Sequence, residues 1–366
     1  CRRIGLNEDE VERVAFLVEH HMLMTTVALY RDTDDLDIVN SFAETMRTDE
    51  RLRELLLLSY ADLASVAPNV WNEWKAALLL KLFLRAERIL HGSEEVAAGE
   101  QAWLKAKAEA VRALAPPPLA KRLDAYLRAQ GDRYLVGFRP EEIVQHMECL
   151  AEARARGLAM RCAADQTTGT SVVVVRQRDR HGLFSMLAGS FTSQMIGVER
   201  AALFTRADGY VVDCFTVKDA VQQRPLTPAQ CHGIERVLHD VLLEGRAIQP
   251  YVDRARRRLF ALHEARVPVR TRVEFDNDAS ATDTVIDVET ADRTGVLYDM
   301  TQALADEGLD IYSARIMTDA RWVRDSFYVR IHERKLEDGT KRAAVRRRLQ
   351  EAIGSVAAAE SQGGTS

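Results

Sequence analysis

The chain has 366 residues, of which 47% are hydrophobic and 29% charged, a length and balance typical of a soluble globular protein with two or three domains. Its formal net charge of −5 gives no basic surplus, so the composition argues against a nucleic-acid partner. No apolar run approaches the roughly 18 residues that a membrane span needs, and no signal-peptide pattern is present. We therefore expect a cytoplasmic protein without a membrane partner.

The five cysteines are odd in number and lack the CxxC spacing of common metal sites. This usage favours reduced cytosolic thiols over a disulfide framework. The chain begins at Cys1 rather than at a methionine, and we expect it to be a piece of a longer protein.

Residues before about 165 have helical periodicity almost throughout. The segments "ERLRELLLLSYADLASV" and "NEWKAALLLKLFLRAERIL" place apolar residues at spacings of three and four, as amphipathic helices do. The stretch "APPPLA" (115–120) interrupts this array, and "GDRYLVGFRPEEIVQHMECL" resumes it. The sequence therefore predicts a helical region that ends near residue 165.

Two polar residues lie on helical stripes that are otherwise apolar. Asp62 continues the stripe of Leu55 and Leu58, and His21 extends a stripe that begins in the first predicted helix. An ionised carboxylate on a buried stripe must be paired or bound to a metal. Both residues are thus either hydrogen-bonded structural groups or ligands of a divalent metal in a hydrolase, and two ligands alone do not define a metal site.

After residue 165 the pattern alternates between strands and helices, and one order of elements occurs twice. The first copy runs through the strand "SVVVV", the helix "GLFSMLAGSFTSQ", the strands "ERAALFT" and "YVVDCFTVK", and the helix "LTPAQCHGIERVLHDVLLEG". The second runs through "TVIDVET", "VLYDMTQALADEG", "DIYSARIMT", "RWVRDSFYVRI" and "KRAAVRRRLQEAIG". A β-α-β-β-α unit with one more strand has the ferredoxin-like arrangement. The segment "TRVEFDN" (271–277) is a candidate for the closing strand of the first copy.

In each copy a polar loop joins the first strand to the first helix. The loops are Asp179-Arg180-His181-Gly182 and Asp292-Arg293-Thr294-Gly295. A helix N-terminus offers unpaired N–H donors and a partial positive charge that suit a carboxylate, and glycine permits close approach of a ligand. The same pattern also occurs as plain turn chemistry, so a ligand site and a structural turn are both open at this point.

The repeated unit resembles the ACT domain, a small βαββαβ module that binds amino acids, commonly at interfaces between paired modules. The family's loop is typically D-R-P-G, and this chain has His181 and Thr294 at the proline position. The resemblance implies a ligand held by the loop and helix start of one module and by the strand after the first helix of another. In the second copy it points to Asp292, Arg293, Thr294, Gly295, Val296 and Leu297, facing Asp310 and Ile311. In the first copy it points to Asp179, Arg180, His181, Gly182 and Leu183.

The strand segment that follows the first helix distinguishes the two copies. In the first copy "MIGVERA" departs from the family's glycine-Leu-Asn pattern. The second copy is therefore the closer match, and we expect ligand binding there first.

The wider sequence resembles the family of bifunctional uridylyltransferase/uridylyl-removing enzymes, which modify the PII nitrogen-regulatory protein. Its most specific stretches are "ADLASVAPNVWNEWK" and "TRVEFDNDAS". The resemblance implies a mixed fold, in which a helical HD-type remainder is followed by two ferredoxin-like ACT domains. The implied domains are the C-terminal part of an HD phosphohydrolase domain (1–92), a helical linker (93–165), ACT domains at 171–250 and 283–358, and a disordered tail (359–366).

The same resemblance implies an activity and its ligands. Full-length members attach UMP from UTP to PII when glutamine is low and hydrolyse it off when glutamine is high, with Mg²⁺ or Mn²⁺ as the metal. Asp62 matches the last metal ligand of the HD domain, and His21 matches an auxiliary histidine. The nucleotidyltransferase signature does not occur in the sequence, and its one His-Asp dipeptide, His239-Asp240, falls in a predicted ACT helix. We therefore expect the chain by itself to lack uridylyltransferase activity.

Two other interpretations are open. A stand-alone ACT-repeat protein that binds an amino acid and regulates a partner without catalysis would have the same repeats. A (p)ppGpp synthetase/hydrolase-like enzyme also combines HD and ACT domains, but it normally has one terminal ACT unit, and the tandem copies argue against it.

Overall fold

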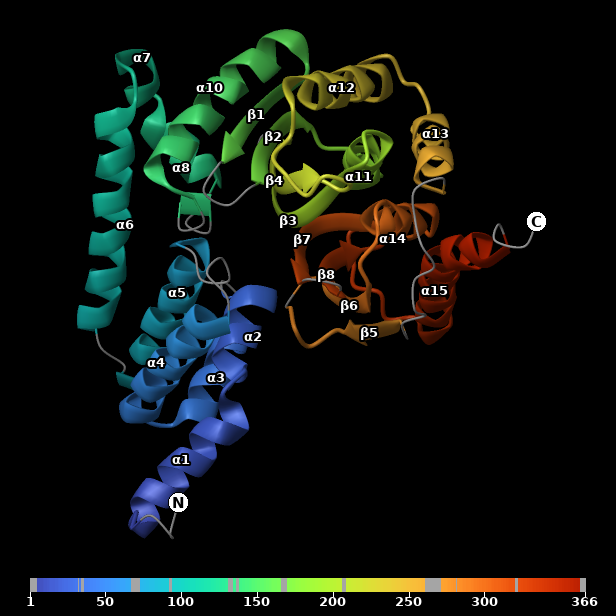
Figure 1. Ribbon diagram of the computed structural model, residues 1–366. Coiled ribbons are helices and arrows are strands. Elements are labelled where there is room, and N and C mark those ends of the chain that lie inside the picture. The colour runs from blue at the N-terminus through green and yellow to red at the C-terminus, as the bar shows by residue number, and fades with distance from the viewer. Residues whose placement is uncertain are drawn as a thin grey trace. The chain divides into compact units, whose positions relative to one another are not determined.

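The computed structural model describes residues 5–31, 33, 36–66, 73–91, 94–130, 134–135, 138–165, 170–205, 209–260, 271–280, 282–319 and 322–362. The chain divides into two compact units, one formed by residues 1–145 with 279–281 and the other by 146–278 with 282–366. Each unit has buried apolar residues of its own. Figure 1 shows helices in the N-terminal part and the strands of the sheet in the C-terminal part. A helical part thus precedes an antiparallel sheet with helices, and the predicted mixed fold class is confirmed.

The first unit is helical wherever the structure describes regular elements in it. These are α1 (Glu8–His20), α2 (Leu23–Tyr30), α3 (Leu36–Met46), α4 (Asp49–Val66), α5 (Glu73–His91), α6 (Glu94–Leu114), α7 (Pro117–Ala120), α8 (Leu123–Gln130) and the start of α10 (Pro140–Arg156). Asn7 opens α1 with a capping box, in which its side chain accepts from the Glu10 N–H at 2.9 Å and Glu10 accepts from the Asn7 N–H at 2.8 Å. Helix α5 packs against α2, α3 and α4 and buries Leu79 and Leu82 completely.

The second unit is built on one antiparallel sheet. Its strands are β1 (Ala159–Asp165), β2 (Thr170–Arg178), β3 (Ile196–Thr205), β4 (Tyr210–Asp219), β5 (Arg272–Asp276), β6 (Thr284–Ala291), β7 (Asp310–Asp319) and β8 (Trp322–Arg330). The order across the sheet is β1-β2-β4-β3-β7-β8-β6-β5. Its helices are α11 (Leu183–Ser193), α12 (Pro228–Leu238) with the π-helical turn His239–Leu243, α13 (Gln249–Phe260), α14 (Val296–Asp306) and α15 (Gly339–Gln362).

The two sequence copies form the two halves of this sheet. They join where β3 pairs with β7, with Ala201 opposite Ile316 at the centre of the joint. Helix α11 of the first copy packs against α14 of the second and against α13, which lies between the copies in sequence. Because β3 and β7 are antiparallel, the start of β7 lies towards the end of β3, and the start of β3 lies towards the end of β7.

The outer strand of each half differs from our expectation. Segment 271–277 does not close the first copy, because β5 pairs with β6 at the edge of the second copy, with Val273 opposite Val288. The first copy's outer strand is β1, which pairs with β2 and occupies the last residues of the region that we predicted as a helical linker. Its sequence "AMRCAAD" is short and alanine-rich and therefore fits a helical pattern as well as a strand. In both copies the outer strand lies beside the first strand of the β-α-β-β-α unit but precedes that unit in sequence, whereas the predicted βαββαβ order places the closing strand after the second helix.

One face of the sheet and the helices α11 to α15 share a single apolar core. Alternate residues of β4 and β8 point into it, and Phe215 and Phe327 are completely buried there. Helices α11 and α14 contribute almost entirely buried faces, including Leu187 and Met300. The core therefore runs through both copies and fixes the loops that precede α11 and α14.

Two cysteines form a bond that contradicts our expectation of reduced thiols. Cys162 of β1 and Cys231 of α12 form a disulfide, with their Cα atoms 6.2 Å apart. Their separation of 69 residues has no recognisable spacing, so only the packing of the edge strand against α12 brings them together. Cys149 and Cys214 are buried and take part in no disulfide within the described residues.

The C-terminal tail is helical for longer than we predicted. Helix α15 continues to Gln362, so residues 359–362 are not the disordered segment that we expected, and 363–366 lie outside the described residues. The run "SVAAAES" is rich in alanine, the strongest helix former, which accounts for this extension. Among the described residues, no helix combines the length and apolar character needed to cross a membrane.

Candidate functional site

Each copy presents a polar loop between the end of a strand and the start of a helix. The loop of residues 179–182 (loop 1) joins β2 to α11, and the loop of residues 292–295 (loop 2) joins β6 to α14. Gly182 and Gly295 are the N-cap residues, with φ of 70° and 87°, and neither helix start receives a side-chain cap from this position. The left-handed backbone favours glycine. The Leu183 and Val296 N–H groups donate to the Arg180 and Arg293 carbonyl oxygens at 3.1 Å, and the partial positive charge of each helix start suits an anion.

Loop 1 faces the start of β7 in the other copy. The Nδ1 atom of His181 lies 2.6 Å from the Asp310 carboxylate, and its Nε2 atom lies 3.0 Å from the Ala305 carbonyl oxygen. We expected Asp310 and Ile311 to face loop 2, and this was wrong. Within one copy, the 11 residues of α14 separate loop 2 from β7 by roughly 16 Å, so only the antiparallel joint with the neighbouring copy brings a loop to a strand start.

A cavity of about 280 Å³ lies between loop 1 and the start of β7. Its size is near the lower end of the range for small-molecule sites. All five residues predicted for the first copy line it, together with Asp310 and Ile311. The further lining residues are Phe184, Ser185, Leu203, Thr205, Val211, Asp213, Thr301, Ala305, Leu309 and Tyr312.

The charges around this cavity are mixed, with an excess of carboxyl groups. Burial raises the pKa of Asp179, a hydrogen bond from the Arg180 N–H opposes this, and the negative charge of Asp310 raises it further. The hydrogen bond to Asp310 raises the pKa of His181, against partial burial. Asp213 adds a third carboxyl group from β4 and is 4% exposed. The cavity thus joins a helix N-terminus, which suits a carboxylate, to carboxyl groups that suit an ammonium or amide.

Loop 2 has different surroundings. Its Arg293 is ion-paired with Asp299 at 2.7 Å and donates to the Ile353 carbonyl at 3.3 Å, and the Arg293 side chain is only 10% exposed. Val296 and Leu297 are buried in the core, and Asp292 and Thr294 are half-buried. The six residues predicted at the second loop and its helix start therefore lie together but do not line the cavity described above, whereas Asp310 and Ile311 do.

The two residues that we predicted near a metal lie on the surface of the first unit. Asp62 in α4 is exposed, so its stripe is not buried at that point. His21 follows α1, is exposed, and contacts the Val18 carbonyl oxygen through Nδ1 at 2.8 Å. Val18 itself is 66% exposed, which contradicts the buried stripe that we inferred for α1. Neither residue belongs to a group of three potential metal ligands among the described residues.

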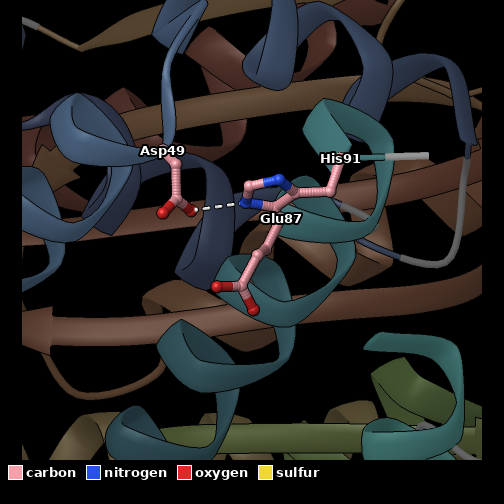
Figure 2. A group of neighbouring side chains, drawn as sticks. All are labelled: Asp49, Glu87 and His91. Atoms are coloured by element: carbon pink, nitrogen blue, oxygen red, sulfur yellow. Dashed lines mark ion pairs between the residues drawn. The ribbon is translucent and has the colours of Figure 1, made fainter. Parts of the chain in front are cut away.

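A different trio in the first unit does gather potential ligand atoms. Asp49 of α4 and Glu87 and His91 of α5 offer atoms within 4.8 Å of one another, and His91 Nε2 lies 3.1 Å from Asp49 (Figure 2). Arg53 lies 2.6 Å from Asp49 and 3.5 Å from Glu87. Because this guanidinium already supplies a positive charge to both carboxylates, the trio is an ion-pair network rather than a metal site.

Several residues of the cavity were not predicted from the sequence. Asp213 had a signal, because "DCFTVK" and "DSFYVR" repeat an aspartate at equivalent positions of the two copies, Asp213 and Asp325. Thr301 and Tyr312 had none, since they belong to the second copy and reach loop 1 only through the pairing of the copies. The dipeptide His239-Asp240 lies in the π-helical turn after α12, where Asp240 accepts from the Tyr251 hydroxyl at 2.6 Å.

Comparison with known proteins agrees with this architecture. The family model described as "ACR9-like, ACT-like domain" matches residues 272–357, which contain the second copy. A bifunctional uridylyltransferase/uridylyl-removing enzyme of Rhodospirillum rubrum is 33% identical over 96% of this chain, and the enzyme of the same name from Azospirillum brasilense is 34% identical over 96%. The chain spans 38% of the length of each of these relatives. Along almost its whole length the chain is thus a homologue of a part of the bifunctional uridylyltransferase/uridylyl-removing enzymes, and it carries an ACT-like domain near its C-terminus.

Proposed function

We propose that this chain is the amino-acid-sensing part of a uridylyltransferase/uridylyl-removing enzyme, and that glutamine binds in the cavity at loop 1. The observation that carries the proposal is the cavity itself, which takes walls from both copies and contains a helix N-terminus beside three carboxyl groups. The α-carboxylate of the ligand would accept from the N–H groups at the start of α11, and its ammonium group would lie near Asp310.

The charge of the cavity favours glutamine over glutamate. Asp179, Asp213 and Asp310 line it, and a second ligand carboxylate would be repelled by them, whereas a side-chain amide can donate to them. Because the ligand would bridge the two copies, binding would favour one arrangement of loop 1 against β7. A ligand can bias an enzyme between two activities only through such a difference in affinity between two states.

In the full-length protein, this bias would set the balance between two reactions on PII. One is the transfer of UMP from UTP, and the other is the hydrolysis that removes it, both dependent on Mg²⁺ or Mn²⁺. Residues 1–92 would contribute the C-terminal part of an HD phosphohydrolase domain, with Asp62 as a metal ligand and His21 nearby.

Calorimetric titration of the chain with glutamine, with glutamate as the comparison, tests the sensor. We expect glutamine to bind at least tenfold more tightly than glutamate, and Asp310→Asn to weaken glutamine binding by at least tenfold, which corresponds to roughly 1.4 kcal/mol. Asp292→Asn, at the equivalent aspartate-bearing loop of the second copy, is the matched control and should bind as the wild type does.

A second experiment tests the coupling to activity. In the full-length protein, glutamine should lower UMP transfer to PII and raise its removal, and Asp310→Asn should shift both responses to higher glutamine concentrations. Equal affinity for glutamine and glutamate, or an unchanged response in the Asp310→Asn enzyme, would contradict the proposal.

A further inference from the structure

The two loops occupy equivalent places in the sequence repeat, so their surroundings can be compared residue by residue. The offset that relates Gly182 to Gly295 also relates Met186 to Asp299, Thr192 to Ala305 and Gly197 to Asp310. Both first helices have 11 residues, and both following strands carry a register shift at the same relative position, between Val198 and Arg200 and between Ile311 and Ser313. The differences at these positions therefore reflect the side chains rather than a different backbone path.

The space in front of the loop glycine is open in one copy and filled in the other. A side-chain carbon placed on Gly182 would have as its nearest neighbours the Ala305 methyl at 3.8 Å and the end of Met186 at 3.9 Å. A carbon placed on Gly295 would lie 2.9 Å from Cγ2 of Thr192 and 3.9 Å from the Arg256 guanidinium. Threonine in place of alanine, and an arginine from α13, thus take the space that forms the cavity at loop 1.

Asp299 holds that arginine in place. Its carboxylate forms ion pairs with Arg256 of α13 and with Arg293 of loop 2, and Asp299 is only 8% exposed. The equivalent residue of the first copy is Met186, and Arg180 of loop 1 instead approaches the Met186 sulfur and the Val241 carbonyl oxygen, each at 3.4 Å. A buried carboxylate between two arginines is costly to open, because each partner left alone would be an uncompensated charge.

The two copies also differ at the position of Asp310, because the equivalent residue of the first copy has no carboxylate. Asp310 of β7 lies at loop 1, whereas its equivalent in β3 is Gly197. Loop 2 is therefore short of the group that would receive an ammonium ion, and it holds a fixed cation close to its helix start.

We propose that loop 2 is a closed site, latched by the ion pairs of Arg256 and Arg293 with Asp299, and that one chain binds one amino acid, at loop 1. The identity of the bound amino acid rests on the proposed function, whereas the closure of loop 2 rests on the ion pairs alone. Helix α13, which lies between the copies in sequence, supplies Arg256 to these ion pairs.

The stoichiometry of glutamine binding tests the first part. We expect calorimetry to give one glutamine per chain, and Asp310→Ala to remove all of the binding. Two glutamine molecules per chain, or one that persists in Asp310→Ala, would overturn the proposal. If the chain binds neither glutamine nor glutamate, the proposed function fails, and the latch is judged by the experiment that needs no ligand.

That experiment is amide hydrogen exchange at two equivalent positions. The Met186 N–H group donates to the Gly182 carbonyl oxygen at 3.1 Å, and the Asp299 N–H group donates to the Gly295 carbonyl oxygen at 3.0 Å. The two amides therefore have equivalent backbone hydrogen bonds. We expect the Asp299 amide to exchange about tenfold more slowly than that of Met186, because the latch must open first. The double variant Arg256→Met/Asp299→Met removes the Arg256–Asp299 pair together and should abolish the difference. Equal exchange in the wild type, or an unchanged difference in the double variant, would overturn the latch.

Discussion

At the scale of single residues, Asp325 is the most unusual group in the second unit. It lies in β8 with no exposed surface, its Oδ1 accepts from the Met317 N–H at 3.2 Å, and its Oδ2 has no partner among the described residues. Burial raises its pKa well above the ordinary value, the Met317 N–H opposes this, and the charge of Asp292 adds to the rise. Its folded-state pKa therefore exceeds its unfolded value, and its contribution to stability is lost as pH rises through the folded-state pKa.

Replacing Asp325 by asparagine should remove this pH dependence. We expect the free energy of unfolding of the wild type to fall with rising pH relative to Asp325→Asn, by about 1–3 kcal/mol between pH 5 and pH 9. Urea unfolding across this range measures the difference, and Asp278→Asn on the exposed surface is the control. Parallel curves for the wild type and Asp325→Asn would show that Asp325 does not ionise in this way.

His181 connects the two copies through a titratable contact. Its hydrogen bond to Asp310 raises its pKa, so the favourable charge of this contact is complete below the unfolded value of about 6.5 and is lost as pH rises through the folded-state pKa. We expect an NMR titration of His181 to show a raised pKa, which falls towards about 6.5 in Asp310→Asn. An unchanged His181 titration in the variant would mean that the contact is absent in solution.

At the scale of secondary-structure elements, periodicity predicted most of the second unit. The two β-α-β-β-α orders and both polar loops lie where the repeat places them, because each strand and helix carries its own apolar pattern. The outer strands were harder to predict, because β1 is short and because β5 has no sequence feature that assigns it to one copy rather than the other. Pairing partners are chosen by tertiary contacts, such as Val273 opposite Val288, and a single-sequence pattern does not contain them.

The two loop glycines provide a matched test of these elements. Both have positive φ, so alanine should cost about 1–2 kcal/mol at either position. At Gly295 the added carbon would also meet Thr192 at 2.9 Å, whereas at Gly182 the nearest atom is 3.8 Å away. We expect Gly295→Ala to lower the free energy of unfolding clearly more than Gly182→Ala does in urea titrations. Equal losses would show that the region around loop 2 can move aside at little cost.

At the scale of the whole second unit, the candidate site depends on the pairing of the two copies. The loop sequences predicted where a ligand could bind, but each copy alone has no strand start near its own loop. The joint of β3 with β7 supplies Asp310 to loop 1, whereas the equivalent residue of β3 is Gly197, which has no carboxylate to offer. The loop and strand motifs of the sequence favoured the second copy, whereas the cavity lies at the first loop. The residues that decide this are distant in sequence from the loops: Ala305 leaves space at Gly182, and Thr192 and Arg256 fill the space at Gly295.

The shared core further implies that the two copies unfold as one cooperative unit. Phe215 and Phe327 are equivalent residues of β4 and β8, both completely buried in the same apolar cluster. Phe327→Ala should cost about 3–5 kcal/mol and, if the copies are coupled, should accelerate hydrogen exchange equally in the central amides of β2 and of β6. Phe215→Ala is the reciprocal variant and should have the same effect on both strands. Acceleration confined to the copy that carries the substitution would show two independently unfolding halves, and the cavity between them would then open whenever either half does.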